Sequence, residues 1–118
     1  MTTREVAHRY NELAKLGKFD LIQDELFSLD CESVEPSHSK WLHSVKGIDE
    51  IKKKGVEFNS KIEQVHSSYC GSPVIAGHYF SLEMGMDITF KDGIRLDLDE
   101  ICLFQVKDGK VISEQFFY

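Results

Sequence analysis

The last third of the chain, residues 74–118, consists almost entirely of residues that favour β-strands, and two similar turns divide it into three strands. Lys91-Asp92-Gly93 and Lys107-Asp108-Gly109 each lie between apolar runs. In that setting Lys-Asp-Gly is typical of a three-residue hairpin loop with glycine in the left-handed region. We therefore predict a long antiparallel meander that turns at residues 91–93 and 107–109.

Helical patterns fill most of the chain before the meander. Thr2 and Glu5 form a capping box, and apolar residues recur at helical spacing as far as Gly17, which predicts a helix over residues 3–16. The remaining expected elements are a helix over 19–29, a strand over 30–35, a loop over 36–46, a helix over 48–59 and a strand over 61–70. Helices followed by a sheet predict an α+β domain, with the helices on one face of a mainly antiparallel sheet.

Length, charge and cysteine content exclude several classes of protein. The length predicts a single domain over residues 1–118. We expect no nucleic-acid partner, because the net charge is −6 and the only basic cluster, Lys52-Lys53-Lys54, is interpreted as the solvated face of a helix. No apolar run approaches the ~20 residues that cross a bilayer, so we expect no membrane association and a cytoplasmic location. The three cysteines lack the spacing of a zinc site, and we expect reduced thiols and no metal.

The turns also predict which side chains share a face of the sheet. If both loops have three residues, Phe90 pairs with Ile94 and Val106 with Lys110, and the pleat extends this pairing along the strands. Cys102 then lies opposite Glu114. The predicted inner face comprises His78, Phe80, Leu82, Met84, Glu100, Cys102, Phe104, Glu114 and Phe116.

Two carboxyl groups, Glu100 and Glu114, interrupt this otherwise apolar face. An ionised carboxylate that is buried without a partner is strongly unfavourable, so each needs a cavity, a partner or a raised pKa. One interpretation is a pair of acids whose pKa values are pushed apart for proton transfer. The other is a structural role, in which they pair with Arg95 or His78 or lie at the open end of the domain.

The order of elements, the helix start Gly47-Ile48-Asp49-Glu50-Ile51 and the final hairpin Asp108-Gly109-Lys110-Val111-Ile112 together resemble the nuclear transport factor 2-like superfamily. The nearest group is the SnoaL-like (polyketide cyclase-like) one, and the resemblance covers the whole chain. It implies a curved sheet wrapped round three helices into a cone, also known as a cystatin-like roll, with a pocket at the open end. The superfamily contains isomerases, cyclases, dehydratases and transport factors, so this fold marks function weakly.

Assembly can also be predicted. Dimers through the outer sheet face are common in this superfamily. In this chain the outer face of the meander carries Ile101, Leu103 and Phe117, which is more apolar area than one exposed sheet face normally leaves in water. We therefore expect a homodimer.

Ketosteroid isomerase, a well-understood member of the superfamily, implies roles for individual residues. Arg9-Tyr10 has the spacing of its oxyanion-hole tyrosine, and Glu35-Pro36 lies where it has its general base, with one residue inserted. Cys102 stands two residues before an aromatic, where that enzyme has a second acidic donor, so this acid is missing. From the residues alone, Tyr10 is equally interpretable as a core aromatic and Glu35 as a solvated residue at a strand end.

The loop at 36–46 commonly covers the pocket in this fold. An aromatic and an imidazole there, Trp41 and His43, suit ligand contact and proton transfer near neutral pH. The alternative is that Trp41 covers the edge of the core and that His43 is solvated.

Two functions are therefore left open. The first is an isomerase, cyclase or dehydratase that acts by proton transfer without a cofactor, with Tyr10, Glu35, Glu114 and His43 as catalytic candidates. Its ligand would be a small apolar or partly polar organic molecule in contact with Trp41, Phe80, Leu82, Met84, Glu100, Cys102, Phe104 and Phe116. The second is a non-catalytic module for ligand binding or dimeric assembly.

Overall fold

A computed structural model describes all 118 residues and shows three helices and one seven-stranded sheet. The elements are α1 Thr3–Lys15, α2 Phe19–Leu26, β1 Phe27–Val34, β2 Val45–Lys46, α3 Ile48–Ser60, β3 Ile62–Cys70, β4 Val74–Ala76, β5 Tyr79–Phe90, β6 Arg95–Lys107 and β7 Lys110–Phe117. The predicted α+β class is confirmed. Residues 74–118 contain one more strand than predicted, the short β4.

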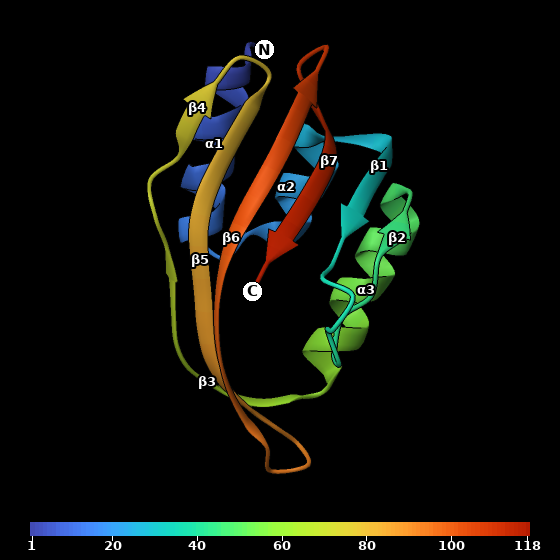
Figure 1. The fold of residues 1–118 in the computed structure, drawn as a ribbon, viewed down its shortest axis with the longest axis vertical. Coiled ribbons are helices and arrows are strands. Elements are labelled where there is room, and N and C mark those ends of the chain that lie inside the picture. Colours follow the sequence, from blue (N-terminus) through green and yellow to red (C-terminus); the bar gives the residue numbers. More distant parts are fainter.

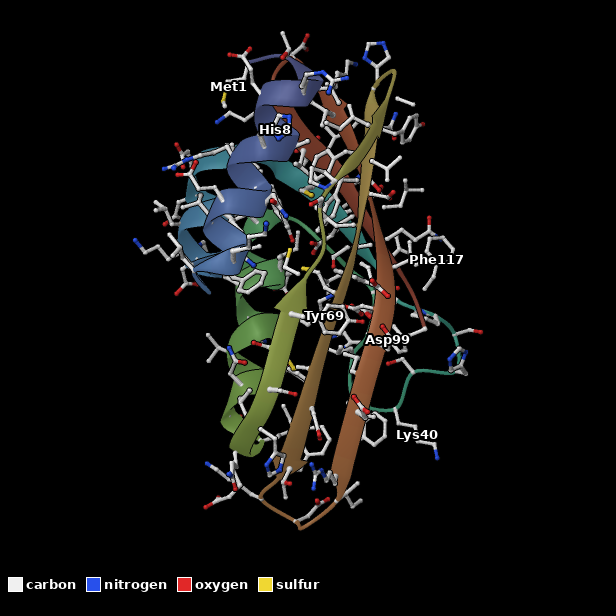
Figure 2. All side chains as sticks on the ribbon, turned by 90° about the vertical axis from the view of Figure 1, so that its left-hand side faces the viewer. Met1, His8, Lys40, Tyr69, Asp99 and Phe117 are labelled. Carbon is white, nitrogen blue, oxygen red and sulfur yellow. The ribbon has the colours of Figure 1, made fainter.

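The sheet has the order β2-β1-β7-β6-β5-β3, and β4 pairs with the first part of β5. Only β1 and β7 are parallel, and the other pairs are antiparallel. The long strands β5 and β6 run most of the length of the molecule and curve (Figure 1). All three helices lie on one side of the sheet (Figure 2), as predicted. None of these helices is long and apolar enough to span a membrane.

Helix α1 begins and ends close to the predicted residues. The Thr2 hydroxyl accepts a hydrogen bond from the Glu5 amide at 3.1 Å, and the Glu5 carboxylate accepts one from the Thr2 amide at 2.9 Å. This reciprocal cap satisfies two amide groups that a helix start leaves without partners. Beyond the helix, Gly17 has φ 70°, which terminates it in the left-handed region.

Helix α2 is shorter than predicted, because the chain changes to a strand at Phe27. Leu29, expected on the apolar side of the helix, is 83% exposed. Phe27 is buried and pairs with Val111 of β7. Pairing with β7 and burial of Phe27 therefore override the helical spacing of the sequence.

The turn between β5 and β6 has the predicted register. Phe80 pairs with Phe104, Leu82 with Cys102 and Met84 with Glu100, as expected for the loop at residues 91–93. Gly93 has φ 92°, the left-handed conformation that this loop requires.

The turn between β6 and β7 differs from the prediction. Lys107 pairs with Lys110, so the loop has two residues, Asp108 and Gly109, with φ values of 52° and 75°. Positive φ at both positions is the signature of a type I′ turn. A loop shorter by one residue would by itself turn every later side chain of β7 to the opposite face.

A β-bulge in β7 corrects this shift. Val106 pairs with Val111 but Gln105 pairs with Ser113, which leaves Ile112 as an extra residue. Glu114 therefore lies opposite Phe104, rather than opposite Cys102 as predicted. The shorter loop and the bulge each shift the pairing by one residue. Since side chains alternate between the two faces, the combined shift of two residues keeps Glu114 on the inner face.

The core consists of two groups of buried side chains. In the larger, the rings of Tyr10, Phe80 and Phe104 pack together, with centroids 4.5 Å apart for Tyr10 and Phe104 and 4.7 Å for Phe80 and Phe104. The smaller contains Phe58, Ile88 and Phe90. Residues of both groups line the cavity described below.

Candidate functional site

A cavity of about 710 Å³ lies between the helices and the inner face of the sheet. Its volume is in the range of pockets that hold small organic molecules. All three helices and strands β1, β3, β5, β6 and β7 contribute to its wall. Most of the wall is apolar, and its ionisable members include Tyr10, Glu35, Lys54, Glu100 and Glu114.

Glu114 is a deeply buried carboxyl group of the cavity, with only 6% of the residue exposed. It lies on β7 opposite Ser33 of β1, whose hydroxyl donates a hydrogen bond to Glu114 Oε2 at 2.7 Å. Burial raises the pKa of Glu114 to about 7, although the Ser33 hydrogen bond and the Lys54 charge act in the opposite direction. Glu114 therefore changes its protonation state near neutral pH.

Lys54 of α3 joins two of the carboxyl groups. Its buried ammonium donates hydrogen bonds to Ser33 Oγ at 2.5 Å and to Glu35 Oε2 at 2.9 Å. Ser33 thus accepts from Lys54 and donates to Glu114. The result is a continuous chain of hydrogen bonds from Glu35 through Lys54 and Ser33 to Glu114.

Lys54 is not among the candidates expected from the sequence, and the interpretation of residues 52–54 as a solvated face is wrong for this buried residue. A signal was present in the spacing. Lys54 is three residues after Ile51 and four before Phe58, so it lies on the same side of α3 as these two buried residues.

Glu35 follows β1 and is buried, not solvated. Its carboxylate accepts hydrogen bonds from Lys54 and, at 2.8 Å, from the Tyr118 hydroxyl. The Tyr118 oxygen also lies 2.7 Å from Ser39 Oγ. Burial raises the pKa of Tyr118, which therefore stays a hydrogen-bond donor. Both Glu35 oxygens are thus engaged by protein donors.

Glu100 lies on β6 and is half-buried at the cavity wall. Its only hydrogen bond comes from the Cys102 thiol, at 3.6 Å. Burial, followed by the charge of Glu35, raises the pKa of Glu100 to about 7. The structural pairing considered for Arg95 is wrong, because Arg95 binds Asp87 at 2.8 Å instead.

Tyr10 and Glu114 line the same cavity. The Tyr10 ring packs on Phe80 and Phe104, and no protein group hydrogen-bonds its hydroxyl. Burial and the neighbouring charge of Glu114 raise the pKa of Tyr10 well above its ordinary value, so the hydroxyl keeps its proton. Tyr10 is thus a residue of the cavity wall whose hydroxyl group stays protonated.

The other predicted ligand residues divide into two groups. Met84 and Phe116 line the cavity together with Glu100. Four others share the inner face but are packed in the core and do not line the cavity: Phe80, Leu82, Cys102 and Phe104. They lie opposite α1, which covers that end of the sheet and fills the space above them.

The loop after β1 contributes a different residue from those expected. Trp41 is half-buried and stacks on Phe90, with ring centroids 5.5 Å apart, while its neighbour Leu42 lines the cavity. His43 is exposed and is not part of the cavity wall. No group of His, Cys, Asp and Glu side chains has an arrangement that could hold a metal ion.

Comparisons with known proteins agree with this architecture. A family model described as a SnoaL-like domain matches residues 1–118. A candidate SnoaL-like polyketide cyclase from Mesorhizobium loti has a similar structure, with 28% identity, a TM-score of 0.92 and coverage of 100% of both chains. A search of the curated proteins found no match.

Two more distant structures share the fold and were crystallised with small molecules. TerC, co-crystallised with polyporic acid, is 14% identical with a TM-score of 0.75, over 98% of this chain and 90% of TerC. A Catenulispora acidiphila protein with a ketosteroid isomerase-like fold, in complex with trimethylamine, is 18% identical with a TM-score of 0.73, over 99% of this chain and 87% of that one.

Proposed function

Because the chain belongs to the SnoaL-like family, we propose that its cavity binds a small organic carbonyl compound and catalyses proton transfer on it without a cofactor. Isomerisation, cyclisation and dehydration of such compounds share one step, the removal of a proton from the carbon beside the carbonyl group. The observation that carries the proposal is Glu114, a carboxyl in a largely apolar cavity whose pKa of about 7 suits it to accept and return a proton.

In this proposal the ionised Glu114 is the general base. The C–H bond of the substrate breaks, the proton binds to the Glu114 carboxylate, and the electron pair moves to the carbonyl oxygen to form an enolate. Tyr10 donates a hydrogen bond to that oxygen as its charge develops. Glu114 then returns the proton to a different atom.

Glu35 has a supporting role here, although the ketosteroid isomerase resemblance implies it as the base. Lys54 and Tyr118 already donate to its two carboxylate oxygens. Removing these donors would leave buried partners unpaired. Glu114 has one such donor, Ser33 on Oε2, which leaves its other carboxylate oxygen available to accept a proton.

The structural neighbours support occupation of the cavity by a small molecule. TerC and the Catenulispora acidiphila protein were each crystallised with an organic compound. A cavity of about 710 Å³ has room for a compound of comparable size.

Exchange of hydrogen for deuterium at carbon tests the proposal. A panel of small ketones and diketones is incubated with the protein in deuterated water, and exchange beside the carbonyl is followed by NMR. We expect catalysed exchange with the wild type and a loss of about 100-fold or more with Glu114→Gln. Glu83→Gln, an exposed glutamate of β5, is the matched control and should behave as wild type. Exchange that is absent in the wild type, or unchanged in Glu114→Gln, would contradict the proposal.

Ligand binding without turnover is the second candidate. The observation that favours it is the completeness of the hydrogen-bonded chain from Tyr118 to Glu114, which needs no substrate to satisfy it. Binding that persists in Glu114→Gln, together with no exchange in the wild type, would support this alternative.

A further inference from the structure

Glu100 differs from the other carboxyl groups of the cavity in having no strong partner. Glu35 is paired with Lys54, and Glu114 accepts from Ser33. Glu100 has only the weak donor Cys102, at 3.6 Å, and forms no ion pair. A carboxylate in such a place lacks the compensation that buried charges normally have.

The charged and titratable groups around Glu100 do not supply that compensation. They are Tyr10 and Lys15 of α1, Glu35 after β1, Lys54 of α3, Tyr69 and Cys70 of β3, Cys102 of β6, Glu114 of β7 and the terminal Tyr118. Lys54 is committed to Glu35 at 2.9 Å, and Lys15 is exposed on the last turn of α1. Of the three carboxyl groups at the cavity wall, Glu100 is thus the one without an ion pair or a hydroxyl donor.

The apolar wall of the cavity that contains Glu100 has surfaces suited to organic ammonium ions. Met84 of β5 pairs directly with Glu100, and Met86 lies next along the same face. Phe58 and Phe116 contribute aromatic rings, and the Lys54 ammonium already lies 5.6 Å from the centre of the Phe116 ring. Aromatic faces stabilise ammonium groups that have lost their water, and the flexible methionine side chains adapt to the apolar substituents of such groups.

We propose that the cavity selects small organic cations, compounds with a quaternary or protonated tertiary ammonium group that pairs with Glu100. This inference rests on the proposed function, because it concerns the same cavity. It adds that the carbonyl substrate carries a positive charge. An anionic ligand would instead lie beside Glu100 and Glu114, where like charges repel.

Choline and its neutral carbon analogue, in which a carbon atom replaces the nitrogen, provide a matched pair of probes. Choline stays charged at every pH used, so any pH dependence comes from the protein. Binding to the ¹⁵N-labelled protein is measured by NMR at about pH 6 and about pH 8. We expect choline to bind more tightly than the analogue at the higher pH.

The preference for choline should fall about tenfold between the two pH values, because Glu100, with a pKa of about 7, is mostly neutral at the lower one. It should disappear in Glu100→Gln and persist in the control Glu83→Gln. Absence of choline binding, equal binding of the two probes, or a preference that survives in Glu100→Gln would overturn the inference. Binding of the analogue in the cavity without a cation preference overturns this inference alone, whereas failure of the deuterium exchange overturns the proposed catalysis alone.

Discussion

At the scale of single residues, Lys54 determines how the acidic groups of the cavity are compensated. It is almost fully buried and binds Glu35 directly and Glu114 through Ser33. Without it, Glu35 would be a buried carboxylate held only by the Tyr118 hydroxyl. The cost of leaving one member of a buried ion pair alone is large, even where the pair itself adds little stability.

We therefore expect Lys54→Met to lower the free energy of unfolding by about 3–5 kcal/mol. Lys53→Met, one residue earlier and exposed, is the control and should change it by less than about 0.5 kcal/mol. Urea unfolding measures both. The double variant Lys54→Met/Glu35→Gln should recover part of the loss. Equal stability of the two single variants would refute the role given to Lys54.

Some residues of the site could be found from the sequence, and others could not. Glu114 and Glu100 are found because a carboxyl on an apolar strand face is unusual, and Tyr10 because the Arg9-Tyr10 pair resembles that of ketosteroid isomerase. Lys54 was missed because three consecutive lysines suggest exposure. Which inner-face residues line the cavity depends on where α1 covers the sheet, which no local pattern encodes.

At the scale of elements, the last strand shows why register is hard to predict. The turn residues correctly indicated a hairpin at 107–109, but the loop has two residues instead of three. The bulge at Ile112 then restores the inner position of Glu114. A bulge depends on the pairing of both strands, so the sequence of β7 alone does not reveal it.

Strand β5 contains a glycine whose place is set by its neighbours. Tyr69 of β3 crosses Gly85 and hydrogen-bonds to Asp99 of β6, and Figure 2 shows Tyr69 and Asp99 close together. A Cβ atom at Gly85 would lie 2.3 Å from the Tyr69 ring and 2.7 Å from the Leu98 carbonyl oxygen. The second of these is backbone, which cannot move without disturbing β6.

Gly85→Ala should consequently lower the free energy of unfolding by about 1–3 kcal/mol. The matched control is Gly55→Ala in α3, where a Cβ meets no atom within 4 Å. That substitution should raise stability by up to about 1 kcal/mol, because alanine favours the helix. Thermal and urea unfolding measure both variants. A Gly85→Ala protein as stable as Gly55→Ala would contradict the crowding seen at this position.

At the scale of the whole molecule, the outer face of the sheet is unusually apolar. Ile101 and Phe117 pair across β6 and β7 and are 57% and 48% exposed. Leu103 lies on the same face, and Figure 2 shows Phe117 on the side away from the helices. Exposed apolar patches of this kind mark interaction sites. The homodimer expected from the sequence remains a prediction.

Sedimentation should show a dimer at about tens of micromolar and a monomer for Phe117→Asp. Val56→Asp, an exposed apolar residue on α3, should remain dimeric. A wild-type monomer at that concentration would rule out a stable dimer through this face.

Stability should also depend on pH through the cavity. The pKa values of Glu100 and Glu114 are raised from 4.5 to about 7 on folding. Between these two pH values the folded protein therefore binds more protons than the unfolded chain. Their contribution to stability is fully present below about pH 4.5 and is lost as the pH rises through about 7. The difference in unfolding free energy between wild type and Glu100→Gln/Glu114→Gln should follow this course in urea titrations. A difference that is constant with pH would disprove it.

Direct titration of Glu114 tests whether the cavity holds a carboxyl group that exchanges its proton near neutral pH. The protein is labelled with ¹³C in its glutamate carboxyl groups, and the Glu114 signal is identified by its loss in Glu114→Gln. We predict a midpoint near pH 7, and a higher one in Ser33→Ala, because the Ser33 hydrogen bond lowers the pKa of Glu114. A midpoint near the ordinary value of 4.5 would show that Glu114 is ionised at neutral pH and would contradict the proposed site.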